Sequence, residues 1–268
     1  MRFSIITASY NTAPYLEQAI RSVLAQRQSG IDVQYIVIDG GSSDATPDIL
    51  ARYRSEISHL IVEPDSGPAN ALNKGLRLAD GELVAWLNAD DLYYPDTLAR
   101  VRDCAAGYPR AAMYFGRCPI VDQQGQEIRS LITRIKELFF PLSSRFTYQC
   151  INYLSQPALF FRKEALTQAG PLREDMVAAW DYEFILRLWH WGPAVRVAGN
   201  EPLAAFRWHP NSISGSHFAT QFREEYEAAI ADAGRFSPQA LLHFFVRWGI
   251  VGIYHLLTHR RTLSDPGR

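Results

Sequence analysis

Short apolar runs alternate with amphipathic segments over the first 115 residues of the chain. Apolar runs of about four to eight residues are typical of buried strands, whereas apolar positions three and four apart indicate helices. In Pro14–Gln26, for example, Leu16, Ile20 and Val23 fall on one helical face. The pattern predicts strands at Arg2–Ala8, Val33–Ile38, His59–Val62 and Leu83–Leu87, and helices at Pro14–Gln26, Pro47–Tyr53, Pro68–Leu78 and Pro95–Cys104.

Strands that alternate with helices predict βαβ units and a mostly parallel sheet. In such sheets, ligands bind at the carboxyl ends of the strands. Polar or acidic residues follow the first, second and fourth predicted strands, and the third leads into Glu63-Pro64-Asp65. The sequence therefore predicts a ligand site along this one edge of the sheet.

The second half of the chain has a less regular pattern. Residues 131–154 show no clear periodicity, and we expect a loop there of the kind that often carries specificity. The tail from Phe218 to His259 predicts two helices separated near Pro238. The other predicted elements are strands at Ala112–Gly116, Ile120–Asp122, Glu127–Ile128, Ala158–Arg162 and Leu203–Trp208, and helices at Lys163–Ala169 and Tyr182–Trp191.

Composition narrows the classes of partner. The 27 Lys and Arg residues balance 28 Asp and Glu residues, which argues against a nucleic acid partner because that would require a basic face. Cys104, Cys118 and Cys150 are too few and too widely spaced for a disulfide framework or a cysteine-rich zinc site. The N-terminal apolar stretch is too short for a signal peptide, and no apolar run of about 18 residues exists. These features predict a cytoplasmic protein.

The acidic cluster Asn88-Ala89-Asp90-Asp91 follows a predicted strand directly. Two neighbouring carboxylates raise each other's pKa unless a cation neutralises them. Mg²⁺ or Mn²⁺ would do so, since these ions take oxygen ligands together with substrate phosphates. The alternative is a turn in which an aspartate caps the following helix.

Three further residues each have two interpretations. Asp39 is either a ligand for a base or ribose, or a turn residue of its glycine-rich loop. Asp181 opens a predicted helix and is either a general base or an N-cap. His209 follows a predicted strand, where it binds a metal or phosphate or is a structural histidine.

Residues 239–258 are strongly apolar and aromatic but are interrupted by Arg247. An arginine at the centre of a spanning helix is unfavourable. The segment, extended to 261 by a basic end, is instead predicted to lie on a membrane surface, on its own domain or on a second subunit.

In their order along the chain, these motifs resemble those of the family 2 inverting glycosyltransferases. The resemblance implies a GT-A-type fold, which is a Rossmann-like α/β fold with a mostly parallel sheet flanked by helices, here with a C-terminal helical extension. It is dense over residues 3–98 and extends to about 214. The matching stretches are Ser4–Asn11, Tyr15–Gln26, Val37–Thr46, Glu63–Gly67, Ala71–Gly75 and Trp86–Asp91.

The resemblance implies a role for each matching residue. Asp181 would be the catalytic base, and Asp90, Asp91 and His209 would bind Mn²⁺ or Mg²⁺. It also implies a nucleotide-sugar-binding half at 1–115, an acceptor-binding half of the same domain at 116–216, and a helical tail at 217–268. The implied nucleotide-sugar-binding residues are Thr7, Ser9, Tyr10, Asn11, Asp39, Asp65, Asn73, Lys74, Asn88 and Ala89.

Two positions depart from the family pattern. Asn88 replaces the first aspartate of the usual DxD motif, and Trp180 replaces the glutamate that usually precedes the catalytic aspartate. Glu183 and Asp175 are therefore alternatives to Asp181 as the base.

The expected function is metal-dependent, inverting transfer of a sugar from a nucleotide-diphosphate donor to a saccharide or lipid-linked acceptor. Such enzymes serve polysaccharide, lipopolysaccharide or glycolipid assembly, so we expect peripheral membrane contact through 239–261 or a homo-oligomer. One alternative is a nucleotide-sugar-binding protein without turnover. Another is a sugar-phosphate nucleotidylyltransferase. Such an enzyme would need a Gly-rich loop with Arg or Lys after the first strand, and Tyr10–Pro14 is not a loop of this kind.

Overall fold

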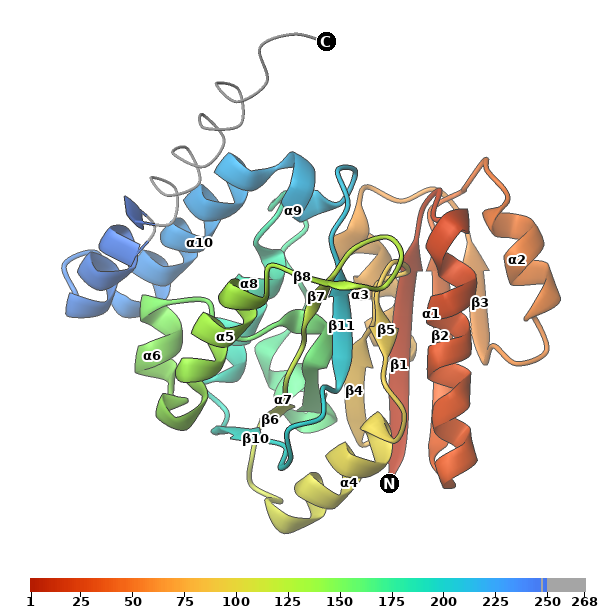
Figure 1. Ribbon diagram of the computed structural model, residues 1–268, viewed down its shortest axis with the longest axis horizontal. Helices are drawn as coiled ribbons and strands as arrows, with labels where there is room; N and C mark the ends of the chain where they lie inside the picture. The colour runs from red at the N-terminus through yellow and green to blue at the C-terminus, as the bar shows by residue number, and fades with distance from the viewer. Residues whose placement is uncertain (247, 250–268) are drawn as a thin grey trace, which may run out of the picture.

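The computed structural model describes residues 1–246, 248 and 249. Its centre is a seven-stranded sheet flanked by helices on both faces (Figure 1). The strands in spatial order are β10 (Ala194–Arg196), β6 (Met113–Phe115), β9 (Leu159–Arg162), β4 (Leu83–Trp86), β1 (Arg2–Ser9), β2 (Asp32–Asp39) and β3 (His59–Val62).

The predicted parallel arrangement is present over most of this sheet. β1 lies between β2 and β4 and is parallel to both, and β3 is parallel to β2. Seven of the eight residues of β2 are buried, as expected for a parallel strand covered on both faces. β9 is antiparallel to β4 and β6, so one strand of the second half runs against its neighbours.

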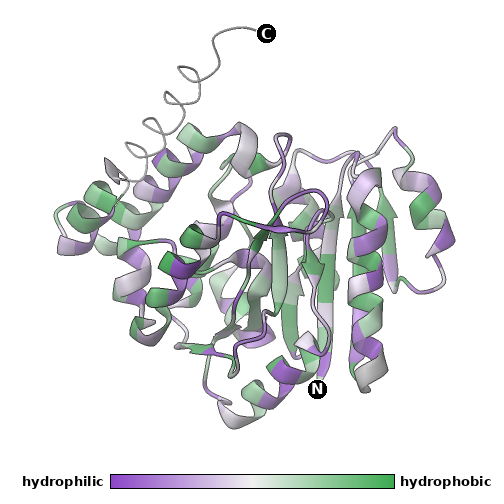
Figure 2. Ribbon diagram, viewed as in Figure 1, coloured by the Kyte–Doolittle hydropathy of each residue, from purple (hydrophilic) through white to green (hydrophobic). Residues whose placement is uncertain are grey.

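Helices cover both faces of the sheet, and in Figure 2 the strands are mostly green whereas the helices mix green and purple. One core cluster joins Ile5 of β1 to α1, α2 and α4, and the other joins Ile6 of β1 to α3, α7 and α8. The bounds are α1 (Ala13–Ala25), α2 (Thr46–Arg52), α3 (Pro68–Leu78), α4 (Thr97–Gly107), α7 (Lys163–Ala169) and α8 (Trp180–Leu188).

A second, four-stranded sheet was not predicted. Its order is β5 (Leu92–Tyr93), β11 (Ala204–Arg207), β7 (Ile120–Val121) and β8 (Glu127–Ile128). β7, β8 and β11 fall at predicted strands, whereas β5 was not predicted because two residues are too few to show an alternating pattern. β11 brings the segment from Arg207 to His209 next to the acidic cluster that follows β4.

The prediction of a loop at residues 131–154 is wrong, because much of this segment is helical. It contains α5 (Ser130–Leu138), a 3₁₀ turn η2 (Phe140–Leu142) and α6 (Arg145–Cys150), and another turn, η3 (Gln156–Ala158), follows. α5 buries only Thr133 and exposes Leu131, Ile135 and Leu138. These three residues are four and three positions apart, so α5 has an apolar face at helical spacing that the sequence prediction did not recognise.

The tail begins with α9 (Ile213–Ser216) and α10 (Phe218–Ala233), and a further helix starts at residue 238 and continues through 246. α10 contributes Ala228 and Ala229 to the core cluster that contains α3 and α8. The end of the proposed membrane segment, residues 250–261, lies outside the described residues. Within the described part of the chain, every helix is too short or too polar to cross a membrane.

Candidate active site

A cavity of about 1080 Å³ opens at the carboxyl ends of the parallel strands. Segments that follow β1, β2, β3 and β4 form one side of it, and α5, α8 and the segment after β11 form the other. It lies at the edge of the sheet where the sequence predicted a ligand site. The predicted site residues that line it are Ser9, Tyr10, Asn11, Asp65, Asn88, Ala89, Asp90, Asp181 and His209.

Tyr10, Gly40 and Asp65 form one end of the cavity. The Tyr10 side chain is 63% exposed, and Asp65 Oδ1 accepts a hydrogen bond from Gly67 N (2.9 Å). A Cβ atom on Gly40 would lie 2.6 Å from Asp65 Oδ2 and 3.3 Å from the Tyr10 ring. Glycine is therefore required for the carboxylate and the aromatic ring to approach this backbone so closely.

Asp39 and Asn11 hold the loops that frame this end. The Asp39 side chain is fully buried, and its carboxylate accepts hydrogen bonds from Ser42 N (2.8 Å) and Ser42 Oγ (2.6 Å). Asn11 has a positive φ of 51° and accepts a hydrogen bond at Oδ1 from Ser43 N (2.9 Å). Both side chains stabilise the β2 loop, and Asp39 matches its turn interpretation.

Three other predicted nucleotide-binding residues lie behind the cavity wall. Thr7 Oγ1 accepts a hydrogen bond from Tyr35 Oη (3.1 Å). Asn73 Nδ2 donates to Leu172 O (2.9 Å), which ties α3 to the segment before α8. Lys74 Nζ forms an ion pair with Glu63 (2.7 Å). Each of these side chains supports the site from outside the cavity.

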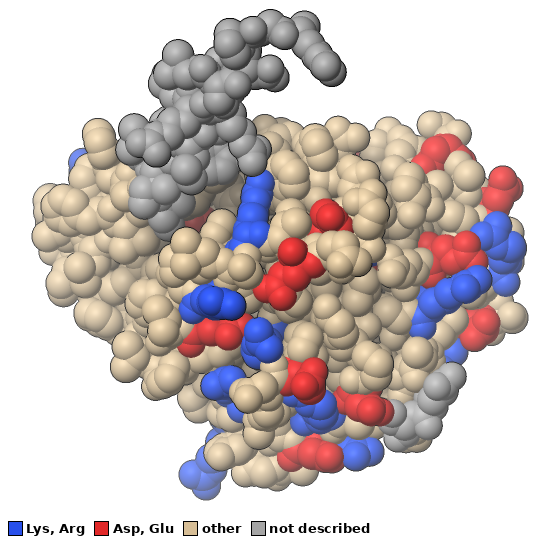
Figure 3. Space-filling view, in the orientation of Figure 1, with Lys and Arg blue, Asp and Glu red and all other residues tan. Residues whose placement is uncertain are grey.

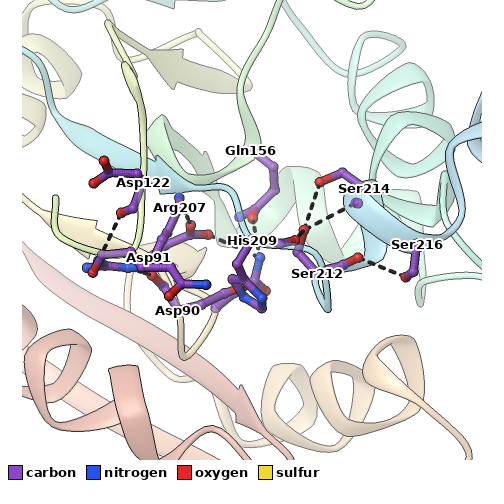
Figure 4. A network of polar contacts seen from close by, with 12 residues as sticks. Asp90, Asp91, Asp122, Gln156, Arg207, His209, Ser212, Ser214 and Ser216 are labelled. Carbon is purple, nitrogen blue, oxygen red and sulfur yellow. Dashed lines mark hydrogen bonds and ion pairs between the residues drawn. The ribbon is translucent and has the colours of Figure 1, made fainter. Parts of the chain in front are cut away.

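Asp90 and His209 meet in the middle of the cavity. Asp90 Oδ2 lies 3.0 Å from His209 Nε2 (Figure 4). The imidazole also stacks on Tyr15, with 4.9 Å between the ring centroids. The pair joins the segment after β4 to the segment after β11. In the part of the chain that the structure describes, no group of three or more His, Cys, Asp or Glu residues could hold a metal ion without other ligands.

Asp91 does not line the cavity, which contradicts the prediction that Asp91 binds the metal ion. It is 1% exposed, and its carboxylate accepts hydrogen bonds from Arg207 N (2.9 Å) and Asn88 Nδ2 (3.2 Å). Burial and the neighbouring charge of Asp90 raise the pKa of Asp91 well above its usual value. Asp91 thus anchors β11, while the adjacent Asp90 faces the cavity (Figure 4).

Arg207 and Gln156 contact the acidic cluster but are not among the predicted site residues. Arg207 is 2% exposed and donates to the carbonyl oxygens of Asp90 (2.8 Å) and Gln123 (2.7 Å). Gln156 lines the cavity, donates to Trp86 O (2.8 Å) and accepts from Asn88 Nδ2 (3.4 Å). The signal in the sequence is the position of Arg207, two residues before His209 at the end of a predicted strand.

Asp181 lies at the start of α8 and lines the opposite side of the cavity. Burial raises its pKa to about 6, although a hydrogen bond from Tyr182 N to Oδ1 (2.7 Å) acts in the other direction. The two alternative bases lie elsewhere: Glu183 forms an ion pair with Arg187 (2.8 Å), and Asp175 forms one with Arg173 (2.5 Å). Of the three carboxylates, only Asp181 lines the cavity.

Comparison with known proteins places this geometry in context. The family model described as Glycosyl transferase family 2 matches residues 4–170. An uncharacterized glycosyltransferase from Nostoc sp. is 27% identical over 271 residues, which cover 98% of this chain and 82% of that protein.

Two solved structures resemble the whole arrangement. S. aureus TarS in complex with UDP-GlcNAc has a TM-score of 0.65 at 18% identity, over 86% of this chain and 67% of that one. Mannosyltransferase PcManGT from Pyrobaculum calidifontis, in complex with GDP-Man and Mn²⁺, has a TM-score of 0.62 at 19% identity, over 98% of this chain and 80% of that one. These likenesses confirm the predicted GT-A-type α/β fold.

Proposed function

Because the chain belongs to glycosyl transferase family 2, we propose that it is an inverting transferase that uses a nucleoside diphosphate sugar. The acceptor is a hydroxyl group of a saccharide or lipid-linked saccharide in polysaccharide or glycolipid assembly. The observation that carries the proposal is that a single cavity collects Tyr10 and Asp65, the Asp90–His209 pair, and Asp181. In this proposal, the first group binds the nucleoside, the second binds the diphosphate through a cation, and the third accepts the proton of the reacting hydroxyl.

The nucleoside binds at the end formed by Tyr10, Gly40 and Asp65. The exposed Tyr10 ring offers an aromatic face to the base. Asp65, held at Oδ1 by Gly67 N, presents its other oxygen to a hydroxyl or amine of the nucleoside. TarS is solved with UDP-GlcNAc and PcManGT with GDP-Man, so UDP-sugars and GDP-sugars are the first donors to test with this protein.

The Asp90–His209 pair fits a divalent cation that is bound together with the donor. Mg²⁺ and Mn²⁺ are commonly held by one or two side chains plus substrate phosphates and water. Asp90 Oδ2 and His209 Nε2 would hold the ion, with the donor diphosphate supplying further oxygens. When bound, the ion neutralises the negative charge of the departing diphosphate.

Asp181 then acts as the general base. Its carboxylate accepts the proton of the acceptor hydroxyl while the hydroxyl oxygen forms a bond to the anomeric carbon. The bond from that carbon to the diphosphate oxygen breaks, and the nucleoside diphosphate leaves with the bonding electrons. One displacement from the opposite face inverts the anomeric centre, and no covalent enzyme intermediate forms.

The substitution Asp181→Asn tests the proposal. We expect turnover to fall by about 10²–10⁴-fold, the usual contribution of a general base, while the donor still binds. Thermal shift with a panel of nucleotide sugars, with and without Mn²⁺, measures binding, and acceptor glycosylation measures turnover. Transfer at the wild-type rate by D181N would show that another group is the base. Donor binding by the wild type without transfer to any acceptor in a broad panel would favour a nucleotide-sugar-binding protein.

A further inference from the structure

Two consecutive glutamates connect α10 to the catalytic side of the cavity. Glu224 is 6% exposed and Glu225 is 4% exposed, which is unusual for two adjacent acidic residues. Both lie beyond residues 4–170, the part of the chain that the family model matches. Their contacts show what each buried carboxylate does.

Glu224 binds the backbone at the N-terminus of α8. It accepts hydrogen bonds from Val177 N (2.9 Å), Ala178 N (2.8 Å) and Ala179 N (3.0 Å). Burial alone would raise the pKa of Glu224, but these three bonds outweigh it and lower the pKa. The carboxylate therefore accepts hydrogen bonds from amide groups that have no partner within α8. The last of these amides, Ala179 N, lies two residues before Asp181.

Glu225 lies behind the cavity wall and contacts two residues that line the cavity. Its Oε1 accepts hydrogen bonds from Asn152 Nδ2 (3.0 Å) and Gln221 Nε2 (3.1 Å), both of which line the cavity. Its negative charge favours the protonated form of Asp181. Removal of this charge would make Asp181 a weaker base.

Lys136 of α5 has the opposite effect to Glu225 on the pKa of Asp181. It lines the cavity, and its Nζ donates to Ser155 Oγ (3.3 Å). Burial lowers the pKa of Lys136, while its positive charge favours the ionised form of Asp181. Tyr148 of α6 also faces Asp181, but burial raises its pKa well above 10, so it adds no charge.

We propose that Glu224 and Glu225 make α10 a positioning element of the active site. Glu224 fixes the backbone that carries Asp181, and the opposite charges of Glu225 and Lys136 set the electrostatic environment of its carboxylate. This inference rests on the proposed role of Asp181 as the base. It assigns a function to a helix outside the matched family region.

The electrostatic part is tested with two substitutions that must act in opposite directions. Glu225→Gln keeps an acceptor oxygen for Asn152 and Gln221 but removes the charge, and Lys136→Met removes the positive charge. In the pH dependence of kcat/KM, we expect the acid limb to move to lower pH in E225Q and to higher pH in K136M. Purely structural damage would lower the rate without moving the limb in opposite directions. An unmoved limb in both variants, or a shift in the same direction, would overturn this part.

The positioning part is tested with Glu224→Gln, which replaces one acceptor oxygen by an amide NH2 group that can only donate. We expect kcat to fall at least tenfold with the donor KM changed less than twofold. Glu227→Gln, an exposed glutamate on the same helix, is the matched control and should retain wild-type kcat. Wild-type kcat in E224Q would overturn the positioning role.

These outcomes are separate from the fate of the proposed function. If D181N transfers sugar normally, the base assignment fails and the proposal falls with it. If D181N is inactive but E225Q, K136M and E224Q all behave like the wild type, the base assignment stands and the role of α10 is refuted.

Discussion

Asp181 combines burial with a position at the start of a helix, and the two effects act in opposite directions on its carboxylate. Burial raises its pKa to about 6, and the hydrogen bond from Tyr182 N limits the rise. A base with a pKa in this range is mostly ionised at neutral pH and still binds a proton well. Glu183 and Asp175 lack this combination because arginines pair with them away from the cavity.

The pH dependence of transfer should report this carboxylate. Only the ionised form of Asp181 can accept the hydroxyl proton, so kcat/KM should be constant near pH 8 and fall about tenfold per pH unit below about pH 6. Rates measured from pH 4.5 to 8.5 with saturating metal ion, on protein shown to remain folded, provide the check. A profile that stays flat down to pH 4.5 would contradict a buried base.

Gly40 gives a second prediction at the scale of single residues. In Gly40→Ala, the added methyl group would meet Asp65 Oδ2 at 2.6 Å and the Tyr10 ring at 3.3 Å, so both must move. We expect donor affinity to fall about tenfold, equivalent to about 1.4 kcal/mol, with little change in the melting temperature. Titration calorimetry with the preferred donor measures the effect. Gly107→Ala is the control, since a Cβ atom there meets nothing within 4 Å.

Most of the site residues predicted from the sequence line the cavity, but the side chains that hold them in place were not predicted. Tyr10, Asp65, Asp90 and Asp181 stand in recognisable motifs at strand or helix ends. The contacts of Arg207 and of the α10 glutamates were not predicted, because most of their partners are distant in the sequence and come close only when the chain folds. Their roles therefore required the structure.

At the scale of elements, the regular half of the chain followed its hydrophobic pattern. The strand at His59–Val62 and the helix at Pro68–Leu78 have the predicted bounds. α5 and β5 were missed, because α5 buries little of its surface and β5 has only two residues, whereas β7 and β8 fall at predicted strands. The fold was predictable where each element buries a face against the central sheet.

The contact between α3 and β1 shows how closely such faces pack. A Cβ atom on Gly75 of α3 would lie 2.4 Å from Ile6 Cγ2 of β1. Gly75→Ala should therefore lower the free energy of unfolding by about 1–3 kcal/mol, the usual cost of overpacking a core, even though alanine favours helices. Urea denaturation measures the change. If G75A is as stable as the Gly107→Ala control, the close approach does not limit stability.

At the scale of the whole molecule, charged side chains of both signs are interspersed on the surface, whereas exposed apolar side chains gather on one helix. Acidic and basic side chains lie interspersed on the face shown in Figure 3, in keeping with a net charge of −1. Exposed apolar side chains instead occur together on the helix that starts at residue 238. There, Leu241, Phe245 and Trp248 are 58%, 61% and 69% exposed.

The spacing of these three residues, four and then three apart, places them on one face of that helix. An exposed stripe of leucine and aromatic residues is the pattern of a helix that lies in a membrane interface. We therefore expect the full chain to sediment with vesicles that contain anionic lipid. Replacing Leu241, Phe245 and Trp248 by serine together should remove most of this binding without affecting transfer to a water-soluble acceptor.

The control for this experiment is Tyr108→Ser, which removes a side chain of similar exposure (58%) at the end of α4. It should sediment like the wild type, because a single aromatic residue without apolar neighbours at helical spacing gives little interfacial binding. If the triple variant sediments as well as Tyr108→Ser, the stripe does not bind lipid. A change from dimer to monomer in the triple variant, measured by light scattering in the absence of vesicles, would instead identify the stripe as a contact between two copies of the chain.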